Sequence, residues 1–136
     1  MQTTGVLYLD ASALVKLVVA ERESAALREA LRQWPRGASS VVARVELRLA
    51  AARSATATAR ERAERVLEST SAVAMDRGVI ERAGRLSPLR ALDAIHLASA
   101  LSLGEALGAF VAYDRRLGRA AESAGVLVLA PGITTA

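Results

Sequence analysis

The chain has 136 residues, of which 52% are hydrophobic, so it is long enough for one domain with a sizeable core and too short for a second. It contains no cysteine, which excludes a disulfide framework, and no apolar run approaches the roughly 18 residues of a membrane span. The net charge of +4 suits a polyanionic partner, although the strong preference for arginine over lysine also fits a compositional bias. We expect a single domain over residues 1–136 in a cytoplasmic protein.

Periodicity and turn residues predict strands that alternate with helices along the whole chain. In order, we expect a strand at 5–9, helices at 12–19 and 22–33, a strand at 37–40, helices at 41–53 and 57–69, a strand at 71–75, helices at 77–85 and 90–103, a strand at 109–113, a helix at 115–124 and a strand at 126–129. Gly104, Gly108 and Gly125 are expected at helix ends. This alternation predicts a three-layer α/β/α fold with a mainly parallel sheet of four to five strands.

Two acids follow apolar strands directly. Asp10 ends the run 6–9, and Asp114 ends the run 110–113. Because sites in open α/β sheets form outside the carboxyl ends of the strands, both acids are expected to project into one crevice.

Two further acids interrupt helical patterns. Glu46 lies beside an apolar stripe at helical spacing, which consists of Val42, Val45, Leu49 and Ala52. Asp93 lies at the edge of a second stripe, which consists of Ala94, Leu97, Ala98 and Leu101. Acids in these places are expected to be partly buried.

Four neighbouring carboxylates need a counter-charge, because two unit charges 4 Å apart repel by roughly 4 kcal/mol at an effective dielectric constant of about 20. A divalent cation supplies that charge. The proposed ligands are all hard oxygens and cysteine is absent, which favours Mg²⁺ or Mn²⁺ over Zn²⁺.

With these motifs in this order, the chain resembles the PIN-domain ribonucleases, and within them the VapC-type toxins of toxin–antitoxin pairs. The resemblance covers almost the whole chain. The matching segments are Leu9–Leu17, Ser40 with Glu46, Leu92–Ala98 and Tyr113–Leu117.

The resemblance implies a metal-dependent endoribonuclease that hydrolyses RNA phosphodiester bonds with a metal-activated water and leaves 5′-phosphate and 3′-hydroxyl ends. Asp10, Glu46, Asp93 and Asp114 match the catalytic, metal-binding acids, and Ser12 and Ser40 match supporting hydroxyls. One position departs from the family pattern, since relatives commonly carry Thr or Ser where this chain has Ala112. That departure keeps a second hypothesis open, in which the chain is a non-catalytic PIN-like module that binds RNA or a partner.

Each of these residues also has a purely structural explanation. Asp10 and Asp114 are equally well placed as helix N-caps, the role that we assign to Asp76. Glu46 has arginines nearby at 44, 48 and 53, and Asp93 has Arg90, so both acids could sit in ion pairs. His96 is expected to be a core or rim residue and not a metal ligand.

Three basic residues are candidates for RNA binding. Arg115 and Arg116 begin the helix after Asp114, with Arg119 following, and Lys16 lies one turn after Ser12, where an ion pair is an equally good explanation. Arginines 60, 62 and 65 alternate with acids and are typical of a solvated helix face.

The helix predicted at 12–19 is apolar nearly all round, so it is either buried or covered by a partner. In VapC-like proteins comparable helices form a homodimer and a groove for a VapB-like antitoxin, and the resemblance implies both partners here. Aspartyl-phosphate chemistry fits poorly, because no second acid follows Asp10 by two residues and no lysine ends a late strand. Nucleotide-binding glycine motifs are also missing.

Overall fold

The computed structural model describes residues 4–133. Its centre is a sheet of five parallel strands in the order β3-β2-β1-β4-β5. The strands are β1 (Val6–Leu9), β2 (Arg36–Ser40), β3 (Ser71–Val73), β4 (Leu107–Val111) and β5 (Val128–Leu129). The sheet is therefore wholly parallel, which agrees with the expected fold class.

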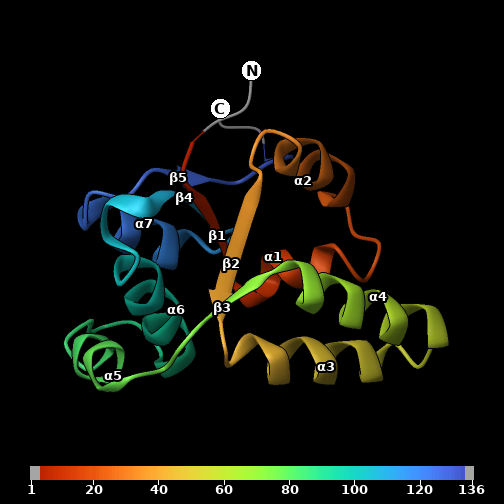
Figure 1. Cartoon of the computed structure of the whole chain (residues 1–136), viewed down its shortest axis with the longest axis horizontal. Helices are drawn as coiled ribbons and strands as arrows, with labels where there is room; N and C mark the ends of the chain where they lie inside the picture. The colour runs from red at the N-terminus through yellow and green to blue at the C-terminus, as the bar shows by residue number, and fades with distance from the viewer. Residues whose placement is uncertain (1–3, 134–136) are drawn as a thin grey trace.

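Helices cover both faces of this sheet, as Figure 1 shows. One face carries α1 (Ala11–Lys16), α2 (Ser24–Leu31), α3 (Ala43–Arg53) and α4 (Ala57–Ser69). On the other side lie α5 (Arg77–Ala83), α6 (Ala91–Leu101) and α7 (Arg115–Ser123), and a short 3₁₀ turn, η1 (Gly104–Ala106), precedes β4. None of the described helices is long and apolar enough to cross a bilayer.

Successive side chains along the central strands point to opposite faces of the sheet, so the core consists of two clusters. Leu7 and Leu9 of β1 face the cluster formed with α1 to α4, whereas Tyr8 faces the cluster formed with α6 and α7. In β4, Val111 faces the cluster with α1 to α4, and Phe110 faces the cluster with α6 and α7. Both faces of the sheet are buried, as expected for a parallel sheet.

Two predicted details are wrong. Gly108 lies within β4 and not at a helix end, and a side chain there would collide with the ring of Trp34. On α3, the predicted buried stripe is largely exposed, since Val45 and Leu49 are 58% and 56% accessible. The buried face is instead the one formed by Ala43, Leu47, Ala50 and Ala51, because small residues allow α3 to pack closely on α1 and α4.

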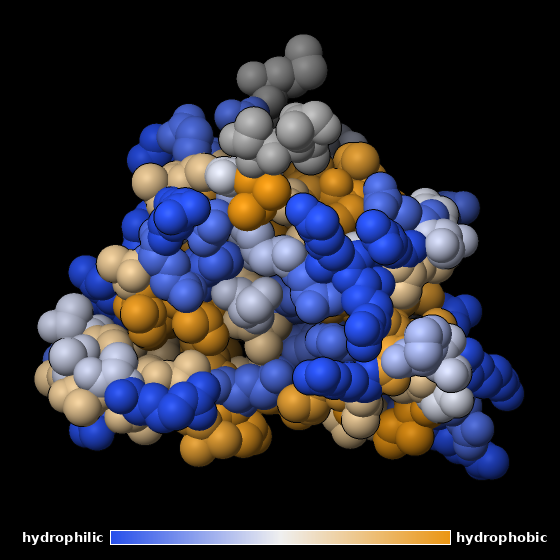
Figure 2. Space-filling model, turned by 180° about the vertical axis from the view of Figure 1, so that it is seen from behind, coloured by the Kyte–Doolittle hydropathy of each residue, from blue (hydrophilic) through white to orange (hydrophobic). Residues whose placement is uncertain are grey.

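The apolar segment 12–19 is covered by its own chain. Ala13, Leu14 and Val18 are buried, and the remaining apolar residues pack against the same core cluster. The large apolar side chains that reach the surface are elsewhere in the described chain: Val45 and Leu49 on α3, Met75, Ile80, Leu92, Leu127 and Ile133. Figure 2 shows hydrophobic patches along the lower edge of the molecule, the edge at which α3 lies in Figure 1.

Candidate active site

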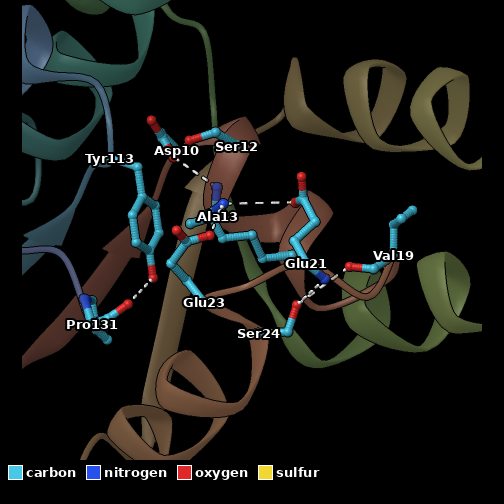
Figure 3. Close-up of polar contacts among 10 residues, drawn as sticks. Asp10, Ser12, Ala13, Val19, Glu21, Glu23, Ser24, Tyr113 and Pro131 are labelled. Carbon is cyan, nitrogen blue, oxygen red and sulfur yellow. Dashed lines mark hydrogen bonds and ion pairs between the residues drawn. The ribbon is translucent and has the colours of Figure 1, made fainter. Parts of the chain in front are cut away.

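Asp10 lies at the carboxyl end of β1 and caps α1. Its Oδ1 accepts hydrogen bonds from the Ala13 amide at 2.9 Å and from Ser12 Oγ at 2.8 Å; Figure 3 shows Ser12 beside the carboxylate. The residue is only 5% exposed. Both bonds fall on one oxygen, so Oδ2 accepts none from the described residues. The cap and a ligand role are therefore compatible, and the Ser12 hydroxyl holds the carboxylate through the same oxygen as the cap.

Asp114 repeats this arrangement at the end of β4, where its Oδ1 accepts from the Leu117 amide at 2.9 Å and caps α7. Asp76 caps α5 in the same manner, as predicted. The two caps differ in their surroundings, because Asp114 faces the other acids and Asp76 does not.

Glu46 projects from the first turns of α3 and is half-buried, but none of the described arginines forms an ion pair with it. Its Oε1 lies 2.8 Å from His96 Nε2, and Arg48 pairs with Glu64 instead. The arginine explanation for Glu46 is therefore wrong. Asp93, in the first turn of α6, also forms no ion pair within 4.0 Å with a described residue, although Arg90 lies close enough to lower its pKa slightly.

All four acids line one cavity of about 480 Å³, which we call the acid cavity. Asp10 and Asp114 come from strand ends, and Glu46 and Asp93 from the starts of two helices on opposite faces of the sheet. The remaining lining residues are Ala11, Ser12, Arg90, Ala91, Leu92 and His96. The acids thus converge from segments that are far apart in sequence.

Burial and mutual repulsion both act on these carboxyl groups. Loss of hydration raises the pKa of Asp10, and its hydrogen bonds from Ala13 and Ser12 only partly offset this. The pKa of Asp93 is also raised, first by loss of hydration and then by the charge of Asp114. A cation in the cavity would relieve both effects.

The donor set fits a hard divalent cation, because four carboxylates line the cavity and each keeps at least one oxygen that accepts no hydrogen bond from a described residue. Within residues 4–133, however, no three His, Cys, Asp or Glu side chains already lie close enough together to hold a metal ion. The carboxylates are gathered around the cavity and are not locked into a coordination geometry.

A second, larger hollow of about 800 Å³ adjoins the acid cavity, and we call it the arginine groove. It shares Arg90, Asp93 and Asp114 with the acid cavity and extends along α7. Its arginines are Arg90, Arg115, Arg116 and Arg119, and none of them forms an ion pair with another described residue. Their positive charge is therefore available to an anionic ligand.

The family model for the PIN domain matches residues 7–123. The chain belongs to the PIN-domain family. Among its relatives, Ribonuclease VapC46 of Mycobacterium tuberculosis is 44% identical over 127 residues, which is 92% of this chain and 97% of the relative. Ribonuclease VapC47 from the same species is 38% identical over 132 residues, or 93% and 97% of the two chains. These relatives confirm the expected VapC branch of the family.

A solved structure supports the fold of this PIN domain. A chain described as "Toxin-antitoxin complex from Klebsiella pneumoniae" superposes with a TM-score of 0.64 over 79% of this chain and 86% of that chain. The two sequences are 22% identical, so the likeness shows the fold alone.

Two predicted site residues of this PIN domain, Ser40 and Lys16, line neither the acid cavity nor the arginine groove. Ser40 is buried and its Oγ accepts from the Val42 amide at 3.1 Å, so it orders the turn into α3. Lys16 Nζ lies 2.8 Å from Glu23 Oε1 and 4.6 Å from the centroid of the Tyr113 ring. Figure 3 shows Glu23 beside Tyr113, whose hydroxyl donates to the Pro131 carbonyl. To bind a phosphate, Lys16 would have to leave Glu23.

Sequence patterns missed two residues of the site. Arg90 is predicted from the sequence only as a partner for Asp93, yet it lines both hollows. His96 is expected in the core or at the rim; it is 2% exposed, and it also contacts Glu46. Its spacing of three residues from Asp93 was the available signal, but the partner on α3 is 50 residues away in sequence.

Proposed function

We propose that this VapC-type PIN domain is a metal-dependent endoribonuclease, the toxin of a toxin–antitoxin pair, which hydrolyses RNA phosphodiester bonds. The observation that carries the proposal is the convergence of Asp10, Glu46, Asp93 and Asp114 on one cavity beside the arginine groove. The ribonuclease names of the relatives, with coverage of 97% of their length, support the same activity.

The four acids would hold Mg²⁺ or Mn²⁺, which would supply Lewis acidity for the attack of water on the phosphodiester and for the leaving oxygen. Asp10 and Asp114 offer the oxygens that their helix caps leave free, and Ser12 keeps the Asp10 carboxylate oriented. Arg115 and Arg116 bind the phosphate backbone in the groove that opens beside Asp93 and Asp114. Together they place a phosphodiester against the acids.

The partners follow from the family and are part of the proposal. We expect a VapB-like antitoxin to inhibit the enzyme, a homodimer to form, and the protein to act in the cytoplasm. Because α1 is covered within its own chain, such contacts would use exposed apolar side chains elsewhere, among them Val45 and Leu49 on α3. Light scattering at micromolar concentration tests the homodimer, and a monomer would contradict it.

Cleavage of RNA tests the proposed activity directly. Protein freed of any partner should cut structured RNAs in the presence of Mn²⁺ or Mg²⁺, leave 5′-phosphate and 3′-hydroxyl ends, and lose the activity in EDTA. Cleavage that persists in EDTA, or ends with 2′,3′-cyclic phosphate, would contradict a mechanism in which the acids hold a metal.

The alternative is a PIN-like module that binds RNA or a partner without cutting, and Ala112 is the residue that keeps it open. In the structure Ala112 is 4% exposed, packs in the apolar cluster with Tyr8 and Phe110, and does not line the acid cavity. Retention of all four acids favours the enzyme. Tight RNA binding without cleavage under any divalent metal would favour the module.

Charge removal in the arginine groove should weaken RNA binding. Removing one contact to a phosphate reduces the slope of log K against log salt by about 0.7 for single-stranded RNA, so the double change Arg115→Ala/Arg116→Ala should reduce it by roughly 1.4. Fluorescence anisotropy in EDTA at several salt concentrations measures the slope. Arg62→Ala/Arg65→Ala removes the same charge from α4, away from both hollows, and serves as the control. Equal reductions in both variants would contradict a specific groove.

A further inference from the structure

The histidine of this chain connects the acid cavity to the core. Both ring nitrogens of His96 have partners, since Nε2 lies 2.8 Å from Glu46 Oε1 and Nδ1 lies 2.8 Å from the Tyr8 hydroxyl. Tyr8 is fully buried, and its ring stacks on Phe110 with a centroid separation of 5.2 Å and an interplanar angle of 6°. The ring of His96 is therefore held from the core side and presented to Glu46.

The Glu46 carboxylate defines the direction of its own hydrogen bond, and the Tyr8 hydroxyl, which can donate or accept, adapts to the tautomer that results. A carboxylate can only accept, so the Nε2–H donates to Glu46. A neutral imidazole with Nδ1 as acceptor and Nε2–H as donor satisfies both bonds at once.

This bond joins two helices that pack on opposite faces of the sheet. Of the side-chain hydrogen bonds found among residues 4–133, the bond between His96 and Glu46 is the one that links α6 to α3. Figure 1 shows the two helices on opposite sides of the strand ends. Because α6 also carries Asp93, it supplies one acid of the cavity and fixes the carboxylate of another.

We propose that His96 is a positioning residue, which holds Glu46 Oε1 and leaves Oε2 for a cation in the acid cavity, while the Tyr8 hydroxyl holds the imidazole ring from the core side. The inference rests on the proposed function, because it requires that Glu46 acts with Asp10 and Asp93. Removing a residue that orients a metal-binding carboxylate typically weakens metal binding by about 10- to 100-fold.

The tautomer can be measured in the metal-free protein. The chain has one histidine, so the imidazole signals in a ¹⁵N-resolved NMR spectrum belong to His96 without further assignment. We expect the Nε2–H tautomer in the wild type and a mixture of tautomers in Glu46→Ala, which removes the acceptor that Nε2–H requires. An Nδ1–H tautomer in the wild type, or an unchanged spectrum in Glu46→Ala, would overturn the proposed arrangement.

Mn²⁺ titration by calorimetry tests the effect on Glu46. His96→Leu should weaken Mn²⁺ binding by about 10- to 100-fold, and His96→Gln should restore much of it. The glutamine amide nitrogen is as many bonds from the backbone as Nε2 and can donate to Glu46 in its place. Ser102→Ala is the control on the same helix, because Ser102 is the C-cap of α6, its hydroxyl donates to the Ser99 carbonyl, and it does not line the acid cavity.

A double-mutant cycle shows whether His96 acts through Glu46. If it does, His96→Leu should cause little further loss of Mn²⁺ affinity in a Glu46→Ala background. Additive losses, or wild-type affinity in His96→Leu, would overturn the proposal. Thermal melts establish that each variant is folded, and if His96→Leu does not fold, His96→Gln and Tyr8→Phe carry the same comparison.

The two proposals fail differently. If the wild type binds Mn²⁺ and cleaves RNA while His96→Leu behaves identically, the role of His96 is wrong and the nuclease stands. If the wild type neither binds Mn²⁺ nor cleaves RNA, the proposed function is wrong and the positioning role falls with it, even where the NMR spectrum shows the expected tautomer.

Discussion

Replacing Asp93 by asparagine (Asp93→Asn) should reduce RNA cleavage by at least about 1,000-fold, since a metal contributes several kcal/mol to charge stabilisation and each 1.36 kcal/mol is a tenfold change in rate. Asp93 lines both the acid cavity and the arginine groove, where substrate and acids meet. Asparagine keeps the size of the side chain and removes the charge. Single-turnover cleavage at saturating RNA, measured with Mn²⁺, separates this effect from weaker substrate binding.

Asp76→Asn is the matched control for this loss. Asp76 caps α5 through the same bond that Asp114 makes to α7, but it lies outside the acid cavity. We expect wild-type cleavage from Asp76→Asn. If Asp93→Asn retained activity within tenfold of the wild type, the acid cavity would not be the catalytic site.

The order of the secondary structure could be predicted because each local signal agreed with the fold. For example, α4 begins at Ala57 and ends at Ser69, as its helical pattern predicts, and the structure adds the side chain of Thr56 as its N-cap. The prediction failed where tertiary packing decided the outcome. Gly108 resembles a helix terminator in sequence, but its lack of a side chain serves the close approach of Trp34 to β4.

The convergence of the acids could be predicted, because Asp10 and Asp114 follow strands whose carboxyl ends meet at one edge of the sheet, and Glu46 and Asp93 lie beside apolar stripes. Their partners were not predictable, since a contact such as the one between Glu46 and His96 depends on how α3 and α6 meet across the sheet. The apolar stripe on α3 illustrates the same limit. Val45 and Leu49 have helical spacing, yet the small residues on the neighbouring face are the ones that pack inward.

In metal-free protein, Asp10→Asn should raise the melting temperature at neutral pH. Loss of hydration raises the pKa of Asp10 above its value in the unfolded chain, so the ionised form destabilises the folded state. Asparagine removes that charge, and its side-chain oxygen can still accept from the Ala13 amide and Ser12, so the cap of α1 is kept. Thermal unfolding in EDTA, beside Asp76→Asn, measures the difference.

The raised pKa of Asp10 also predicts how the difference in stability between the wild type and Asp10→Asn changes with pH. As the pH falls from neutral toward the unfolded-state pKa of about 3.9, the folded wild type takes up the proton first and gains stability, so the advantage of Asp10→Asn should shrink.

At neutral pH, Mn²⁺ should reverse the order of the two melting temperatures. A ligand at 100 times its Kd stabilises the folded state by about 2.7 kcal/mol, and Asp10→Asn should lose most of that gain. A lower melting temperature for Asp10→Asn in EDTA would mean that its hydrogen bonds outweigh desolvation. Equal stabilisation of both proteins by Mn²⁺ would mean that Asp10 is not a ligand.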